Sequence, residues 1–190
     1  MSEFDFDSFM RNVVNHPALS GRVVTRKYKK RAYVLSQGEV CADLFFLRKG
    51  LVKLYYVTLD GKEWIKSFIA DKGILGSRTS QSLGKASPFS ALCLEDTELL
   101  SLPYKEFEKI CFDDLSYARS IFQFTQWLGV KKELREYQLL CLSAEEAYVE
   151  FVSANPNLVK RITQIDIARY LGITPIALSR IKKRMSESGM

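Results

Sequence analysis

The pattern of apolar and polar positions divides the chain into a β-rich part and a helical part. In residues 22–102, short apolar runs alternate with glycine-containing turns, a pattern typical of strands. Residues 51–58 and 63–69 flank Asp60-Gly61, a pair that favours a tight hairpin turn. Several short strands at near-regular spacing predict an all-β sandwich or barrel.

Helical spacing predicts a short leading helix over residues 4–15 and dominates the chain after Pro103. The segment 114–141 contains no proline and predicts one helix about 42 Å long, at 1.5 Å per residue. Its apolar band is wide enough for one side to pack on the β domain while another meets a second copy. Periodicity alone leaves open the alternative that the helix lies entirely on its own domain.

Capping signals indicate where the next helix lies. Ser143 and Glu146 form a capping box, which predicts a helix from there to about Ala154. The residues 155–157 would end it, because Asn-Pro-Asn interrupts helical spacing. The following segment, 158–162, is expected to form a short strand or an extended link.

Residues 163–185 predict two short helices joined by a glycine turn. Thr163 caps the first helix and Gly172 stops it, while Thr174 caps the second, whose first position is Pro175. The residues expected to pack inward are Ile165, Ile167, Ala168 and Leu171 on the first helix and Ile176, Leu178 and Ile181 on the second. This arrangement predicts a helix-turn-helix, with a structural helical hairpin as the alternative interpretation.

Charge singles out the same segment. The chain has 28 Lys and Arg against 22 Asp and Glu, a formal net charge of +6. Residues 160–190 hold seven of these basic residues and two of the acidic ones, so +5 of the excess lies there. Basic surfaces bind polyanions by releasing the counterions condensed on phosphates, although a solvated basic helix face would also explain the charge alone.

The predicted helix-turn-helix makes double-stranded DNA the expected polyanion. Its second helix would enter the major groove with residues near its start at base edges, which makes Ser179 and Arg180 the predicted base readers. Pro175 begins that helix and belongs to the same predicted interface. The residues expected to contact mainly the DNA backbone are Thr163, Gln164, Thr174, Lys182, Lys183 and Arg184.

Other classes of function find little support. No apolar run approaches the roughly 18 residues of a membrane-spanning helix, and the acidic start lacks the features of a signal peptide, so a cytoplasmic protein without a membrane partner is expected. The four cysteines form no CxxC pair, which argues against a zinc site or a disulfide framework. His16 is the only histidine and no common catalytic motif occurs, so neither an enzyme nor a cofactor is expected.

The order of these parts resembles the bacterial Crp/Fnr family of transcription regulators. Residues 37–69 are similar to the family's cyclic-nucleotide-binding β-roll, and residues 162–184 to its DNA-binding signature. The resemblance implies an α+β fold: a jelly-roll-like β-roll effector domain over residues 1–112, a dimerisation helix over 113–141 and a helix-turn-helix domain over 142–190. It also implies a homodimer on a two-fold symmetric DNA site. RNA polymerase and an unidentified small-molecule effector are left open as further partners.

Two departures from the family concern DNA binding. Members with a known recognition pattern often place Arg and Glu in the first turn of the second helix, where this chain has Pro175 and Ile176. The target sequence therefore cannot be read from the chain. Five residues follow Met185, too few for the family's full wing hairpin, so we expect wing contacts to be missing or supplied by a strand near Lys160 and Arg161.

Further departures concern the nucleotide cassette, the segment of the family's β-roll that holds the sugar and phosphate of the cyclic nucleotide. Members that respond to cyclic AMP follow the cassette glycine with a Glu that holds the ribose, and use Arg-Ser to hold the cyclic phosphate. Here Ser follows that glycine and Ser-Pro occupies the Arg-Ser positions, while two lysines replace the hydroxyl residues that meet the base. The resemblance thus implies a degenerate effector pocket and no response to cyclic AMP. Its positions are Gly76, Ser77, Ser87, Pro88, Lys131 and Lys132.

The oxygen-sensing branch of the family needs a cluster of cysteines near its N-terminus, and none precedes Cys41 here. The alternative function is a small-molecule sensor that acts through protein partners, with the helical end as an interaction module. The basic second helix with Arg180 separates the two hypotheses, because a protein-interaction module would not require it.

Overall fold

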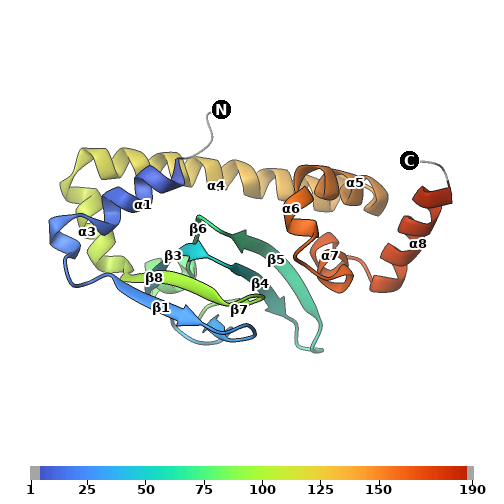
Figure 1. The fold of residues 1–190 in the computed structure, drawn as a ribbon, viewed down its shortest axis with the longest axis horizontal. Coiled ribbons are helices and arrows are strands. Elements are labelled where there is room, and N and C mark those ends of the chain that lie inside the picture. The colour runs from blue at the N-terminus through green and yellow to red at the C-terminus, as the bar shows by residue number, and fades with distance from the viewer. Residues whose placement is uncertain (1–4, 188–190) are drawn as a thin grey trace.

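The computed structural model describes residues 5–187 and shows a β-roll at one end, helices at the other and one long helix along both (Figure 1). The strands are β1 Val24–Tyr28, β2 Tyr33–Leu35, β3 Asp43–Lys49, β4 Leu51–Val57, β5 Glu63–Ala70, β6 Gly73–Leu75, β7 Ser90–Cys93 and β8 Thr97–Pro103. The helices are α1 Phe6–Val14, α2 Arg78–Leu83, α3 Tyr104–Asp113, α4 Leu115–Cys141, α5 Ala144–Ala154, α6 Pro156–Val159, α7 Gln164–Leu171 and α8 Pro175–Glu187, with a short 3-10 helix η1 over Pro17–Leu19.

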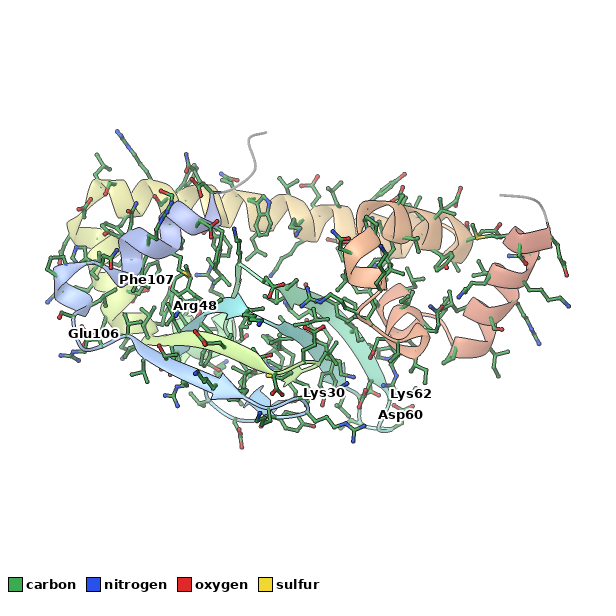
Figure 2. The ribbon with its side chains drawn as sticks, in the orientation of Figure 1. Lys30, Arg48, Asp60, Lys62, Glu106 and Phe107 are labelled. Atoms are coloured by element: carbon green, nitrogen blue, oxygen red, sulfur yellow. The ribbon has the colours of Figure 1, made fainter. Side chains whose placement is uncertain are left out.

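The β-rich part forms two four-stranded antiparallel sheets, which confirms the predicted sandwich. Their strand orders are β1-β8-β3-β6 and β2-β7-β4-β5. The predicted hairpin is β4–β5, where Val57 pairs with Glu63 and Gly61 takes the left-handed φ of +78° that the turn requires. Asp60 and Lys62 lie at its tip and form an ion pair of 2.7 Å (Figure 2).

Strand β3 is buried on both faces because α1 and α3 cover the outer side of its sheet. Phe45 and Leu47 face the inside of the sandwich, whereas Phe46 packs outward, with its ring centroid 5.9 Å from that of Phe9 on α1. Phe107 of α3 completes this outer core (Figure 2). The predicted leading helix is confirmed over α1, and its residue 4 lies outside the described residues.

Helix α4 runs without a break for 27 residues, as predicted. It is capped by Asp114, whose carboxylate accepts the Ser116 N–H at 2.7 Å. Phe124 is buried on one side, but most large apolar side chains of the helix are exposed, so the described residues leave much of its apolar band uncovered. The exposed ones are Leu115, Phe122, Val130, Leu134, Tyr137, Leu139 and Leu140.

The segment after α5 differs from its prediction. Residues 156–159 form the short helix α6 rather than a strand or an extended link, because Pro156 occupies a first helical position, where its fixed φ suits a helix. Residues 160 and 161 follow in a turn, so they are not part of a strand. Helix α5 itself begins at the predicted Ser143 capping box and ends at Ala154.

No helix within residues 5–187 is both long and apolar enough to cross a membrane. The C-terminal helices have a small core of their own, to which the aromatic side chain of Phe68 from β5 also contributes. The helix-turn-helix is therefore packed against the β-roll, with α7 on β5 and α8 at the far end of the molecule (Figure 1).

Candidate nucleic-acid interface and nucleotide cassette

The predicted caps of the helix-turn-helix are confirmed. Thr163 Oγ1 accepts the Asp166 N–H at 3.1 Å, and the Asp166 carboxylate accepts the Thr163 hydroxyl at 2.7 Å. Helix α7 ends at Gly172, whose φ of +75° is left-handed. Thr174 Oγ1 then accepts the Ala177 N–H at 3.1 Å and fixes the start of α8.

Two residues expected in the core of this motif are exposed instead. Ile165 is 49% exposed and Ile176 is 67% exposed, whereas Ile167 and Leu178 are buried. Each exposed isoleucine lies two residues before a buried one, which turns its side chain by about 200° around the helix. The remaining predicted core residues are buried: Ala168, Leu171 and Ile181.

The side of α8 opposite its core is accessible to a partner. Four exposed residues lie on it at helical spacing, and we call this set the outward face: Ile176, Ser179, Arg180 and Lys183. Within residues 5–187, no side chain pairs with Arg180. Lys183 makes only a loose 3.8 Å ion pair with Glu187 one turn later. Thr174 and Pro175 are exposed just before this face.

The residues predicted to contact the DNA backbone already make contacts within the protein. Lys182 Nζ donates to Gln164 Oε1 at 3.0 Å, which brings α7 and α8 together at their polar edge. Arg184 forms an ion pair of 2.5 Å with Glu145 at the start of α5. Both basic side chains are exposed and these pairs are worth little in water, so phosphates could compete with them.

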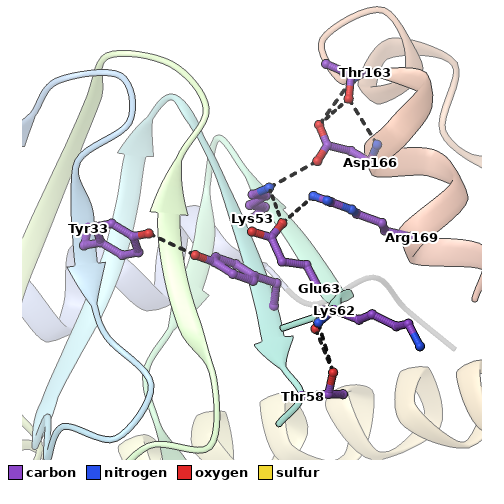
Figure 3. A network of polar contacts seen from close by, with 9 residues as sticks. Tyr33, Lys53, Thr58, Lys62, Glu63, Thr163, Asp166 and Arg169 are labelled. Atoms are coloured by element: carbon purple, nitrogen blue, oxygen red, sulfur yellow. Dashed lines mark hydrogen bonds and ion pairs between the residues drawn. The ribbon is translucent and has the colours of Figure 1, made fainter. Parts of the chain in front are cut away.

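Sequence reasoning missed a polar contact that holds α7 on the β-roll. Lys53 Nζ on β4 lies 3.3 Å from Asp166 Oδ1 and 3.5 Å from Glu63 Oε2, and Arg169 also pairs with Glu63 (Figure 3). Lys53 is 7% exposed and Asp166 is 6% exposed. A lysine inside the buried run of β4 was the available signal, because a buried ammonium needs a charged partner.

Arg161 makes a second contact between the two parts. Its guanidinium donates to Glu95 at 2.7 and 3.0 Å, to Asp71 at 3.1 Å and to the Gly50 carbonyl at 3.1 Å. Hydrogen bonds from Arg161 lower the pKa of Glu95. The expectation that a strand near Arg161 replaces the wing is therefore wrong here, because there is no strand and the side chain is held by the β-roll.

An aromatic contact joins the same surfaces to the long helix. The Phe68 ring of β5 lies 5.7 Å from that of Tyr170 on α7, and the Phe151 ring of α5 lies 4.8 Å from Tyr170. Arg135 of α4 stacks over the Tyr170 ring at 3.9 Å and donates to its carbonyl. Helices α4, α5 and α7 and the β-roll thus meet at one residue, Tyr170.

The first half of the nucleotide cassette is occupied by an unpredicted helix. Ser77 follows Gly76 and is the N-cap of α2, where its hydroxyl accepts the Ser80 N–H at 3.3 Å. A side chain at Gly76 would collide with Gln81, whose amide donates to the Asp43 carbonyl at 2.9 Å. Gly76 and Ser77 therefore have local structural roles: Gly76 leaves room for Gln81, and Ser77 caps α2.

In the second half of the cassette, Ser87 is likewise buried and bonded to the backbone. The Ser87 hydroxyl is buried and donates to the Phe89 carbonyl at 2.8 Å. The Ser87 backbone also bonds Gly38 and Glu39, and Pro88 has no N–H to offer. The Ser87 hydroxyl proton is thus already donated to the protein backbone, and Ser77 is too deeply buried, at 0% exposed, to meet a phosphate.

A lysine that sequence reasoning missed lies behind the cassette. Lys66 Nζ of β5 stacks 5.0 Å from the Phe89 ring centroid. Burial, and then the charge of Lys132 on α4, lower the pKa of Lys66 to about 8. Lys131 instead lies over the Trp127 ring, 4.2 Å from its centroid. The two lysines predicted at the base position therefore face different neighbours.

Comparison with known proteins gives one consistent result. Residues 25–114 match the family model described as cyclic nucleotide-binding domain. The chain is 23% identical to the transcriptional activator protein anr of Pseudomonas aeruginosa over 181 residues, 87% of this chain and 71% of that protein.

Two solved structures have the same fold. FixK2 from Bradyrhizobium japonicum matches with a TM-score of 0.76 at 20% identity, covering 88% of this chain and 86% of that one. A structure from Eubacterium rectale described as a transcriptional regulator of the Crp/Fnr family matches with a TM-score of 0.73 at 18% identity, covering 90% and 82%. Residues 25–114 therefore match a cyclic nucleotide-binding domain, and the chain as a whole has the fold of these two solved structures.

The four cysteines differ in burial: Cys93 is buried, Cys41 and Cys111 are partly buried, and Cys141 is exposed. Within residues 5–187, no group of three or more His, Cys, Asp or Glu is placed to hold a metal ion. Burial raises the pKa values of Cys41, Cys93 and Cys111, the last to about 11. These three thiols therefore stay protonated, and poorly reactive, near neutral pH.

Proposed function

We propose that this chain is a sequence-specific, dimeric DNA-binding regulator of the Crp/Fnr type that acts without cyclic AMP. The observation that carries the proposal is the outward face of α8, where Arg180 and Lys183 are exposed beside a firmly capped helix start. An exposed guanidinium on a major-groove helix can bond guanine O6 and N7 together. The surplus of basic residues around it supplies the phosphate contacts.

The dimer is supported by the exposed apolar side chains of α4. Leu134, Tyr137 and Leu140 are each more than half exposed and lie within two turns of one helix. Burying such a surface against its copy is favourable by about 25 cal/mol per Å² of apolar area. A two-fold dimer would present two α8 helices to half-sites about 34 Å apart.

The lack of a cyclic AMP response is supported by the chemistry of the cassette. A cyclic phosphate carries one negative charge and needs charge-assisted donors. The Ser87 hydroxyl donates to the Phe89 carbonyl and Ser77 is fully buried, while Arg78, which follows Ser77, donates to the Tyr104 hydroxyl at 3.3 Å. Lys66 is an ammonium whose charged form burial already disfavours.

The domain boundaries near residues 112 and 141 are part of the proposal. They are supported by the extent of α4, which begins at Leu115 and ends at Cys141. The β-roll would then be the scaffold that orients the dimer helix, and the segment from residue 142 would form the DNA-binding part. We place the protein in the cytoplasm, where bacterial DNA lies.

In-vitro selection of random duplex DNA at a stated salt concentration tests the function. The wild-type chain should enrich a two-fold symmetric site, because a dimer presents two equal helices. The double variant Arg180→Ala/Lys183→Ala should lose that enrichment. Arg11→Ala/Lys105→Ala is the matched control, since it removes the same two charges from exposed positions on α1 and α3.

Failure of the wild-type chain to enrich any sequence at low salt would contradict the proposed function. Enrichment of one site by all three proteins would contradict the assignment of α8.

A further inference from the structure

The outward face of α8 contains one apolar side chain that folding does not explain. Ile176 is 67% exposed. The buried residues Leu178 and Ile181 are the ones that attach α8 to its core. An isoleucine in water gains nothing over a polar residue at the same place. Its neighbours on the face, Ser179, Arg180 and Lys183, are all polar.

The position of Ile176 is well fixed. Pro175 precedes it with a restricted φ, and Thr174 Oγ1 holds the Ala177 N–H at 3.1 Å, so the first turn of α8 is tied on both sides of Ile176. A β-branched side chain in a helix has one strongly preferred rotamer. The side chain is therefore presented outward in a single direction, as a specific contact requires.

Ile176 also lies in register with Arg180. The two residues are four apart on one helix, which puts them on the same side and about 6 Å apart along the axis. Successive base pairs are about 3.4 Å apart. A contact made by Ile176 thus falls within about two base pairs of one made by Arg180.

The chemistry of the major groove indicates what such a side chain can read. The base edges offer hydrogen-bond donors and acceptors, and one apolar group, the C5 methyl of thymine. We propose that Ile176 is a specificity-determining residue that contacts a thymine methyl within about two base pairs of the guanine bound by Arg180. This inference rests on the proposed function of α8 and adds to it a thymine in each half-site.

Replacement of thymine by uracil in the DNA tests the inference directly. Uracil keeps the base pairing and the O4 acceptor and loses only the methyl group. The experiment starts from the duplex enriched by the wild-type chain, replaces each thymine of one half-site in turn and measures Kd at fixed salt. One replacement should weaken wild-type binding about four-fold, the effect of one lost buried methyl group.

The variant Ile176→Ala should bind the thymine and uracil duplexes equally, because it has no side chain to reach the methyl. Ile176→Val keeps the β-branched shape and should keep part of the difference. Ile165→Ala is the matched control: it removes an exposed isoleucine of α7 and should leave the four-fold difference unchanged. Circular dichroism of each variant checks that the fold is intact.

If the wild-type chain binds its enriched site and no replacement affects it more than it affects Ile176→Ala, the inference is wrong and the proposed function stands. An equal loss of affinity by Ile176→Ala on every duplex, with the uracil effect retained, would also overturn it. If the wild-type chain enriches no DNA at all, the proposed function fails, and the inference fails with it.

Discussion

The nucleotide cassette and the start of α8 both contain hydroxyl side chains that bond the backbone, but the cassette residues are buried whereas the start of α8 is exposed. In the cassette, Ser77 and Ser87 are buried and their hydroxyls bond the backbone of the β-roll. At α8, Thr174 caps the helix in the same way, but its cap leaves Ser179 and Arg180 facing outward. A hydroxyl that bonds a nearby backbone group stabilises the fold. Binding to a partner then depends on whether the neighbouring side chains are exposed.

The two helices of the helix-turn-helix differ in a related way. Helix α7 carries the charged residues Asp166 and Arg169, which are used for docking on β4 and β5. Helix α8 carries Arg180 and Lys183, which stay exposed. Charge that is buried between the parts stabilises one arrangement of the chain, whereas exposed charge is available to a partner.

Asp166→Asn should lower the free energy of unfolding by about 3 kcal/mol, because it leaves the buried Lys53 ammonium with only the more distant Glu63. Urea denaturation measures this. The double variant Lys53→Met/Asp166→Asn is the control and should recover part of the loss, since it removes the unpaired charge. A loss of only about 1 kcal/mol, the value of an N-terminal cap, would show that α7 is not docked in solution.

Arg180→Ala should cost about 1–3 kcal/mol of binding free energy at the matched base pair and relax specificity there. Lys183→Ala is the contrasting variant: it should weaken binding to all sequences and reduce the salt slope by about one. Titrations of the enriched duplex and of single base-pair variants, at several salt concentrations, separate the two effects. Unchanged affinity in both variants would contradict the assignment of the outward face.

Lys66→Met should stabilise the protein by about 1–2 kcal/mol at pH 7, because burial disfavours the charged amine. Its pKa lies near 8 in the folded chain and at 10.5 ordinarily, so between these values the unfolded chain binds more protons and stability rises with pH. The advantage of the variant should therefore fade between about pH 8 and pH 10.5. Denaturation of both proteins across this range measures it, and a constant advantage would contradict the burial of Lys66.

Local patterns predicted much of this fold, because they reflect short-range physics. Alternation and the Asp60-Gly61 turn predicted the β4–β5 hairpin, and the caps at Ser143 and Thr163 predicted where α5 and α7 begin. Helix α2 was missed because residues 78–83 lack an apolar stripe.

The candidate site was less predictable, because it depends on contacts between distant residues. The pairing of Lys53 with Asp166 joins positions 113 residues apart. A lysine within the apolar run of β4 signals that a charged partner is needed, but no local pattern identifies that partner as Asp166. The exposure of Ile176 was missed for a simpler reason. Hydrophobicity alone predicts that an isoleucine beside a buried leucine is buried too, although helical geometry places residues two apart on opposite sides.

The contrast between the exposed face of α8 and the buried cassette is tested by the Kd of the wild-type chain for its enriched duplex. This Kd is measured at fixed salt with and without a large excess of cyclic AMP. We expect tight binding without the nucleotide and the same Kd with it, because Arg180 and Lys183 are exposed in the chain as it stands and Ser77 and Ser87 are buried. If binding requires cyclic AMP, or if cyclic AMP lowers the Kd several-fold, the protein is a cyclic AMP-responsive regulator and the proposed function is wrong.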